Sequence, residues 1–167
     1  MERTGKAAEY FYRACQHWDL NEFKEAAAGF GEGIKLLPDD AESYGYRGEC
    51  YLNLGQPEKA LEDFNKAISL DPKEAEYYDS RGNLYIMLNE MKKADADLEK
   101  AAELNPDKAG KYYYTFGCNV EYRTGDKDEA AKYFKKSVEH GDLHGMAKEM
   151  LKKWGAQLCT PSRGVDE

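Results

Sequence analysis

Two histidines have the spacing of metal ligands on one helix. His140 and His144 are four residues apart, which would place both imidazoles on the same face. Gly141 stands between them at a predicted helix junction, and no further set of ligands accompanies them. The sequence therefore does not favour a metal site.

A glycine-rich stretch imitates the loops that cradle phosphate groups. Gly29, Gly31 and Gly33 follow no predicted strand, and no Lys-Ser or Lys-Thr pair comes after them. They lie instead inside a predicted helix, so we interpret them as a helix that packs closely on a neighbour at Gly33. Each interior glycine costs about 1 kcal/mol relative to alanine, which predicts a helix that frays easily.

The sequence offers no arrangement of a nucleophile with a base. His17 lies near one end of the chain, and His140 and His144 lie near the other. Carboxylates are numerous, but none is singled out by apolar surroundings. We therefore predict that the protein is not an enzyme and uses no cofactor and no metal.

The four cysteines form no C-x-x-C pair and no zinc-like spacing. Three of them fall on predicted helices, where free cysteine behaves as a small apolar residue. We interpret the set as reduced thiols in a cytoplasmic protein. The positions are Cys15, Cys50, Cys118 and Cys159.

The charge balance argues against anionic partners. The chain has 32 acidic and 24 basic residues, for a net charge of −8, so it repels phosphate backbones and anionic membrane surfaces. Its uncharged runs are much shorter than the roughly 20 residues that cross a bilayer. The N-terminus lacks the apolar core of a secretory signal. We expect no nucleic-acid binding, no membrane insertion and a cytoplasmic protein.

A repeat of 34 residues organises the elements that would position any functional residue. Prolines recur at this step, and tyrosine, alanine and large apolar residues recur with them. A fourth repeat follows at a step of 36, with Ala130 and Phe134, and we place its two extra residues near Ala109 and Gly110. The matched sets are Pro38, Pro72 and Pro106; Tyr10, Tyr44 and Tyr78; Ala26, Ala60 and Ala94; and Phe30, Phe64 and Leu98.

Each repeat is predicted to be a pair of helices. Apolar residues recur at steps of three and four, and the break within each repeat falls at Asn21, Gly55, Asn89 or Gly125, residue types that tolerate positive φ. A ninth helix would cap the last repeat with Met146, Met150, Leu151 and Trp154 on its buried face. The predicted helices are 5–18, 21–36, 41–54, 57–70, 75–88, 91–104, 109–124, 127–140 and 143–157.

These helices predict one domain built by stacking. A single hairpin cannot bury its apolar face, so neighbouring hairpins must cover one another. We expect one array over residues 1–158, with repeats at about 7–40, 41–74, 75–108 and 111–144, and a flexible tail over 159–167. The first repeat, with its three glycines, should lose hydrogen-exchange protection before the two central repeats.

The central repeats resemble the tetratricopeptide repeat. The resemblance rests on Tyr44-x-x-Arg47-Gly48-x-x-Tyr51, Ala60-x-x-x-Phe64 and Pro72, and on the same residue types one repeat later. It covers about residues 7–144, although the first repeat has Arg13-Ala14 and the fourth has Asp142 in place of the closing proline. It implies an all-α, right-handed α-solenoid of about four hairpins with a C-terminal capping helix.

The same resemblance implies a concave groove lined by the first helix of each repeat, which takes up a peptide or a partner helix. Repeats are taken to begin at Ala7, Ala41, Ala75 and Lys111. The implied lining is Phe11, Cys15, Trp18 and Asp19; Glu42, Glu49, Leu52 and Asn53; Glu76, Asp79, Asn83, Ile86 and Met87; and Tyr112, Asn119, Tyr122 and Arg123.

This lining predicts a negative middle with apolar ends. We expect a basic or amphipathic peptide, with Asn53, Asn83 and Asn119 bonding its backbone, because an amide both donates and accepts. Trp18 is the predicted hot spot, since tryptophan is enriched among residues that dominate binding energy. The alternative, that these carboxylates are only a solvated face, stays open.

Some members of the family bind the acidic C-terminal peptides of heat-shock chaperones through a cluster of Lys, Arg and Asn. No basic residue stands at the matching positions here, so we do not expect this ligand. The matching positions are Phe11, Cys15, Tyr46, Glu76 and Ser80.

The sequence thus predicts a protein–protein interaction module or adaptor that binds a peptide or partner segment in its groove. A second hypothesis is a structural assembly or oligomerisation module that uses the repeat ends or the convex face. A homo-oligomer is possible, and one that persists on dilution would favour the second hypothesis.

Overall fold

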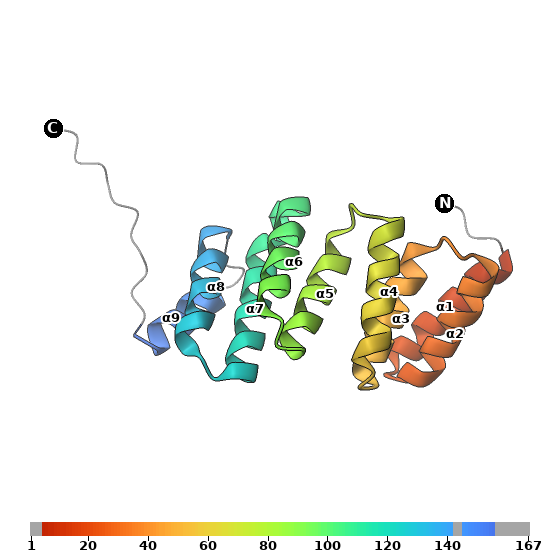
Figure 1. Cartoon of the computed structure of the whole chain (residues 1–167), viewed down its shortest axis with the longest axis horizontal. Helices are drawn as coiled ribbons and strands as arrows, with labels where there is room; N and C mark the ends of the chain where they lie inside the picture. Colours follow the sequence, from red (N-terminus) through yellow and green to blue (C-terminus); the bar gives the residue numbers. More distant parts are fainter. Residues whose placement is uncertain (1–4, 142–144, 156–167) are drawn as a thin grey trace. The chain divides into compact units, whose positions relative to one another are not determined.

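The computed structural model describes residues 5–141 and 145–155, and within these ranges every regular element is a helix. The chain divides into two compact units, Met1–Leu104 and Asn105–Glu167. The N-terminal unit contains α1 to α6 and the C-terminal unit contains η1 and α7 to α9 (Figure 1). The helices are α1 (Gly5–Asp19), α2 (Phe23–Leu36), α3 (Ala41–Asn53), α4 (Pro57–Leu70), α5 (Ala75–Met87), α6 (Met91–Leu104), η1 (Pro106–Lys108), α7 (Ala109–Thr124), α8 (Lys127–Glu139) and α9 (Met146–Lys153).

The predicted breaks within the repeats are confirmed. Asn21, Gly55, Asn89 and Gly125 all have φ between 60° and 69°. In the first three repeats, the amide three residues after the end of the first helix bonds back across the turn, as in Gln56 N to the Tyr51 carbonyl at 2.8 Å. Gly125 makes the simpler bond, to the Glu121 carbonyl at 2.8 Å.

Large rings and small residues fill the hairpin cores. Phe30, Phe64, Leu98 and Phe134 are almost completely buried, as are the alanines that precede each of them by four residues. A Cβ added to Gly48 would lie 2.8 Å from the ring of Phe64. Glycine is therefore required there, because it lets the first helix rest directly on the phenylalanine of the second.

Within the N-terminal unit, α2 packs on α3 and α4 packs on α5, so each hairpin covers the next. The closest glycine contact in α2 is at Gly29, where an added Cβ would lie 2.8 Å from the Cβ of Ala14. At Gly33 the nearest atom would be 3.8 Å away, which is an ordinary contact. The prediction of close packing at Gly33 was therefore wrong by one helical turn.

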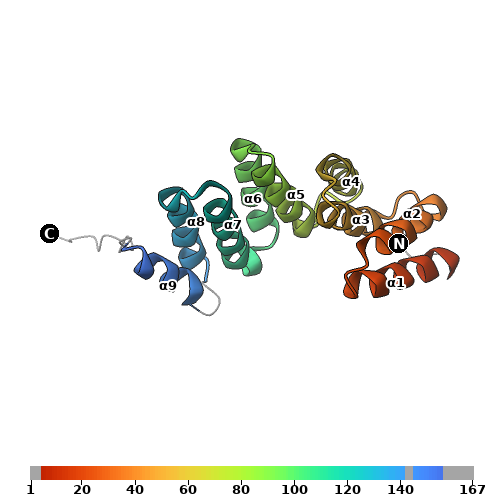
Figure 2. The ribbon, with the colours of Figure 1, turned by 90° about the horizontal axis from the view of Figure 1, so that it is seen from below.

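Within the C-terminal unit, α7, α8 and α9 lie side by side (Figure 2). Ala147 and Leu151 of α9 are fully buried, and the ring of Trp154 lies 5.4 Å from that of Phe134. Met146 is exposed, contrary to prediction, because the packed face is formed by residues 147, 151 and 154 and Met146 lies outside it. The described part of α9 is also shorter than the predicted 143–157.

Some predictions fall on residues outside the described ranges: His144, Cys159 and the tail at 159–167. One continuous array over residues 1–158 and early fraying of the first repeat both stay predictions.

Candidate functional site

The first helices of the N-terminal unit carry most of the residues predicted to line a groove. Phe11 is only 5% exposed and Ile86 only 3%, so both belong to the core and offer almost no surface to a ligand. We call the four carboxylates Glu42, Glu49, Glu76 and Asp79, on α3 and α5, the acidic face. The predicted residues that are exposed or half-buried are Cys15, Trp18, Asp19, Glu42, Glu49, Leu52, Asn53, Glu76, Asp79, Asn83 and Met87.

The two helices of the acidic face are tied together directly. The hydroxyl of Ser80 on α5 donates to the carboxylate of Glu49 on α3. The ring of Tyr77 also rests on Gly45, where an added Cβ would lie 2.6 Å from Cε1. Burial raises the pKa of Glu49, and the bond from Ser80 opposes that rise. Glu49 is therefore held in place by the packing of α3 on α5.

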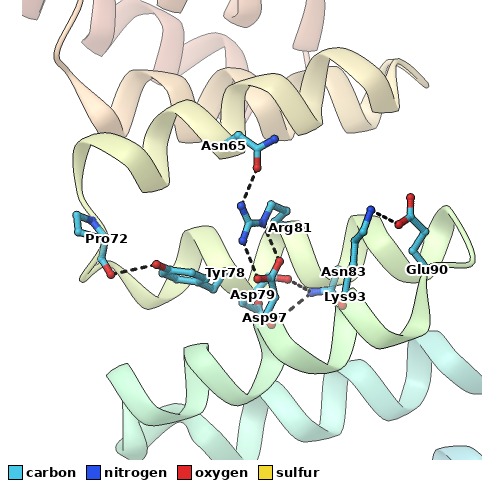
Figure 3. Close-up of polar contacts among 9 residues, drawn as sticks. All are labelled: Asn65, Pro72, Tyr78, Asp79, Arg81, Asn83, Glu90, Lys93 and Asp97. Carbon is cyan, nitrogen blue, oxygen red and sulfur yellow. Dashed lines mark hydrogen bonds and ion pairs between the residues drawn. The ribbon is translucent and has the colours of Figure 1, made fainter.

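The only basic residues of α3 and α5 are held by carboxylates of the second helices. Arg81 Nε and Nη2 donate to both oxygens of Asp97, at 2.7 and 2.8 Å (Figure 3). Arg47 makes the same double contact with Asp63, at 2.7 Å for each bond. Each hydrogen bond to aspartate raises the pKa of its arginine. Each pair is charge-neutral, so the two cations of α3 and α5 are engaged by aspartates of the second helices.

Each arginine also lies between two tyrosines of its own helix. The guanidinium of Arg47 is 5.4 and 5.7 Å from the rings of Tyr44 and Tyr51. Arg81 lies 5.7 and 5.9 Å from Tyr78 and Tyr85. The Tyr-x-x-Arg-Gly-x-x-Tyr motif is therefore a packing motif, because cation–π contact and ion pairing fix each guanidinium against its hairpin.

Arg81 makes one further bond, across to the preceding repeat. Its Nη1 donates to Asn65 Oδ1 on α4 at 2.7 Å (Figure 3). The position one repeat before Asn65 is Gly31, so Arg47 finds no side-chain amide there. A Cβ added to Gly31 would lie 3.7 Å from Arg47 Nη1, an ordinary contact distance.

We predict that Gly31→Asn raises the free energy of unfolding by ~0.5–1.5 kcal/mol, from a new hydrogen bond and from higher helix propensity. Urea unfolding followed by circular dichroism measures the change. Gly31→Ala is the matched control, because it improves propensity without adding an amide. Equal stability of the two variants would show that the asparagine makes no bond to Arg47.

Carboxylates crowd together at the start of α3 and α5. The pKa of Glu74 is raised by hydrogen bonding with Glu76 and by burial. The pKa of the Tyr77 phenol is raised by burial and then by Glu74, Glu42 and other nearby acids. Negative charge here thus disfavours further negative charge, and a cation would relieve the repulsion.

The asparagines predicted to bond a ligand are engaged on their own helices. Asn53 Nδ2 donates to the Glu49 carbonyl at 2.9 Å. Asn83 Nδ2 donates to the Asp79 carbonyl at 2.9 Å and to its carboxylate at 3.3 Å (Figure 3). A ligand carbonyl would have to replace these bonds, so ligand binding by the two amides stays a prediction.

An aromatic cluster adjoins the acidic face at α1. The ring of Tyr46 lies 6.0 Å from Trp18 and 5.7 Å from Phe11, edge to face, and stacks on Phe30 at 5.4 Å. Trp18 is half-buried, and its indole Nε1 is buried without a hydrogen-bond partner in the protein. A buried donor without an acceptor is costly, which singles out Trp18 within the cluster.

The fourth repeat has a different register from the predicted one. Gly117 rests on Phe134 as Gly48 rests on Phe64, with an added Cβ 2.9 Å from the ring. The turn residue with positive φ follows the packing glycine by seven residues in the third repeat, from Gly82 to Asn89. In the fourth repeat the interval from Gly117 to Gly125 is eight residues, so one extra residue lies in the second half of α7. The other precedes Gly117. Placing both near Ala109 and Gly110 was therefore wrong.

This correction moves the predicted residues of α7 by one position. Tyr112 is 3% exposed and faces the core, so it offers almost no surface to a ligand. Tyr122 is 86% exposed, Arg123 is exposed and Asn119 is half-buried. Counting from Gly117 instead, the positions equivalent to the predicted lining are Lys111, Cys118, Glu121 and Tyr122.

The described residues can also be compared with the requirements of a metal site, a membrane span and a reactive thiol. Across 5–141 and 145–155, no group of three or more His, Cys, Asp or Glu could hold a metal ion. In those same ranges, no helix has the length and apolar character needed to cross a membrane. The thiol of Cys50 lies in the core, where burial raises its pKa to about 12, so it is poorly suited to nucleophilic chemistry.

Comparison with protein families gives matches over more than half of the chain. Two tetratricopeptide repeat models match, one over residues 41–74 and the other over residues 75–108 and 110–139. The last match begins at Gly110, as the register set by Gly117 requires. The sequence matches no curated protein.

Solved structures share the fold. The crystal structure of MamA protein has a TM-score of 0.70 and 23% identity, covering 90% of this chain and 84% of MamA. The structure of pilF of Pseudomonas aeruginosa has a TM-score of 0.72 and 17% identity, covering 92% of this chain and 71% of pilF. The first tetratricopeptide repeat domain of Spaghetti (RPAP3), bound to the HSP90 peptide SRMEEVD, has a TM-score of 0.65 and 20% identity. That match covers 70% of this chain and 92% of the Spaghetti domain. At these identities the likeness supports the fold alone.

Proposed function

We propose that this chain, which belongs to the tetratricopeptide repeat family, binds a basic or amphipathic segment of a partner protein on its acidic face. The family and its all-helical hairpins make the chain a protein-interaction module. Beyond this role, we propose that the bound segment is basic or amphipathic. We also propose that the protein is not a catalyst and works in the cytoplasm.

The neutralisation of Arg47 and Arg81 is the observation that carries this proposal. Both guanidinium groups are committed to Asp63 and Asp97, which are 4% and 6% exposed. Both cations of α3 and α5 are therefore engaged on the side of the second helices. Next to the acidic face, hydrogen bonding with Glu76 and burial raise the pKa of Glu74. The four carboxylates of the acidic face would attract a ligand with lysine or arginine side chains.

The apolar part of an amphipathic ligand has a place next to these charges. Trp18 and Tyr46 lie where α1 meets α3, and the Trp18 side chain is half-buried, so part of its apolar surface is accessible to a ligand. At the end of α5, Met87 is exposed. We propose that an apolar side chain contacts Trp18 while basic side chains contact Glu76 and Asp79.

The proposal differs from binding of an acidic chaperone tail. The Spaghetti structures with the HSP90 peptide share only the fold with this chain. At the positions matching the family's basic cluster, Tyr46 is packed among aromatic rings and Ser80 donates to Glu49. An acidic peptide would meet the like charge of Glu76 there, so we propose that it binds weakly.

The test uses two fluorescent peptides that share leucine and tryptophan positions but carry either lysine or glutamate elsewhere. We predict that the lysine peptide binds, and that its affinity falls at least about tenfold when NaCl rises from about 50 to about 300 mM. Fluorescence anisotropy measures both. Tighter binding of the glutamate peptide, or an affinity independent of salt, would reject the proposal.

A further inference from the structure

Charge is divided very unevenly between the two compact units. The N-terminal unit, residues 1–104, comprises 13 basic and 22 acidic side chains, so its net charge is −9. In the C-terminal unit, residues 105–167 comprise 11 basic and 10 acidic side chains, a net charge of +1. The negative charge of the chain therefore lies in the N-terminal unit, and the C-terminal unit is nearly neutral overall.

The basic charge of the C-terminal unit is concentrated on its last two helices. Five lysines there are exposed, and we call them the lysine surface. Lys132 bonds to Glu129, and Lys127 lies 5.8 Å from the ring of Trp154. The five are Lys127 and Lys132 on α8, and Lys148, Lys152 and Lys153 on α9.

The structure of α9 determines how this surface can be used. Its apolar residues Ala147 and Leu151 are fully buried, and Trp154 packs on Phe134. Inserting α9 into a lipid surface would expose this core, so its lysines must act on a partner that docks from outside. A protein surface rich in carboxylates fits that requirement.

We propose that the lysine surface of one copy docks on the acidic face of a second copy. The inference rests on the proposed function and deepens it, since it names the basic segment that the acidic face receives. The charge complementarity is between groups of this chain itself: Glu76 and Asp79 on α5 in one copy, and Lys148, Lys152 and Lys153 on α9 in the other.

Such a contact joins two different surfaces, so each copy keeps one of them available for another copy. Head-to-tail contacts of this kind build open chains that lengthen with concentration, whereas a contact between identical surfaces stops at a dimer. Because the attraction is between exposed charges, salt should break it.

Two charge-reversal variants of the full chain test the proposal. The tail variant carries Lys148→Glu, Lys152→Glu and Lys153→Glu, and the face variant carries Glu76→Lys and Asp79→Lys. A control variant carries Lys66→Glu and Lys92→Glu, which reverses exposed lysines on α4 and α6. Circular dichroism checks that all of them are folded.

Sedimentation velocity then gives the expected results. The wild type and the control variant increase in mass with concentration at about 50 mM NaCl and become monomeric at about 500 mM. The tail and face variants are each monomeric alone. An equimolar mixture of them associates again, because the lysine surface kept by the face variant can dock on the acidic face kept by the tail variant, and the two reversed surfaces are complementary as well.

Other outcomes overturn the inference. A wild type that stays monomeric at low salt rejects self-docking, and the proposed function still stands if the lysine peptide binds. Association that persists in the tail variant or at high salt would indicate an apolar contact. Binding of the lysine surface to a glutamate peptide or to phosphatidylserine vesicles, without self-association, would assign it another partner.

Discussion

The Asp97→Ala variant is expected to lose about 2–3 kcal/mol of unfolding free energy, because it leaves a largely buried guanidinium without its anion. The Arg81 side chain is 18% exposed, and Asn65 still accepts one of its hydrogen bonds. The loss should therefore fall below the roughly 3–5 kcal/mol typical of fully buried pairs. Urea unfolding of the two proteins measures the difference.

Glu103→Ala is the matched control for this variant. It removes an exposed carboxylate from the same helix, where Glu103 pairs with Lys100 at 2.9 Å, and should cost less than about 1 kcal/mol. If Asp97→Ala were as mild as Glu103→Ala, the Arg81 pair would not hold the third hairpin together.

The face variant, Glu76→Lys with Asp79→Lys, is expected to bind the lysine peptide about tenfold to a hundredfold more weakly than the wild type. It replaces two attractions with two repulsions on α5, and it does not touch Arg81 or Asp97. Fluorescence anisotropy at about 50 mM NaCl measures the affinity, because low salt preserves the interaction of exposed charges.

Glu58→Lys with Glu62→Lys makes the same change of charge on the exposed side of α4. The control changes the net charge by the same amount, so it reduces long-range attraction equally. It leaves the acidic face intact, so it should weaken binding much less than the face variant does. An equal loss in both variants would mean that the peptide responds to the charge of the whole unit, with no preferred surface.

The repeat made most of the fold predictable from sequence. Positive φ at Asn21, Gly55 and Asn89 follows from residue type and position, and the burial of Phe30 and Phe64 follows from their spacing. Both features are local or periodic, so one sequence is enough to find them.

The fourth repeat shows where periodicity stops being informative. A step of 36 reveals two extra residues but does not show where they lie. The signal that could have located them is the glycine that precedes the core phenylalanine: Gly48 precedes Phe64 by 16 residues, and Gly117 precedes Phe134 by 17. Using that pair would have set the register of α7 and excluded Tyr112 from the exposed surface.

The Arg–Asp pairs also follow the repeat of the sequence. Arg47 and Asp63 recur as Arg81 and Asp97 at the same step of 34. Their pairing decides the charge of the acidic face, since it removes the only cations of α3 and α5. Ignoring it leaves open whether those helices are acidic or neutral.

The state of the asparagines could not be predicted from spacing. An amide one turn from a backbone carbonyl can bond to it or to a ligand, and both choices suit the same sequence. In the structure Asn53 and Asn83 both bond back to their own helix. Only a bound ligand can show whether these bonds exchange.

The central claim is that a basic segment binds on α3 and α5 of the N-terminal unit, and an NMR titration of the labelled full chain with the lysine peptide tests it most directly. Chemical-shift changes should be largest at the amides of Glu49, Asp79 and Asn83, and in the indole N–H of Trp18. Changes confined to the second helices α4 and α6, or to the C-terminal unit, would contradict the claim.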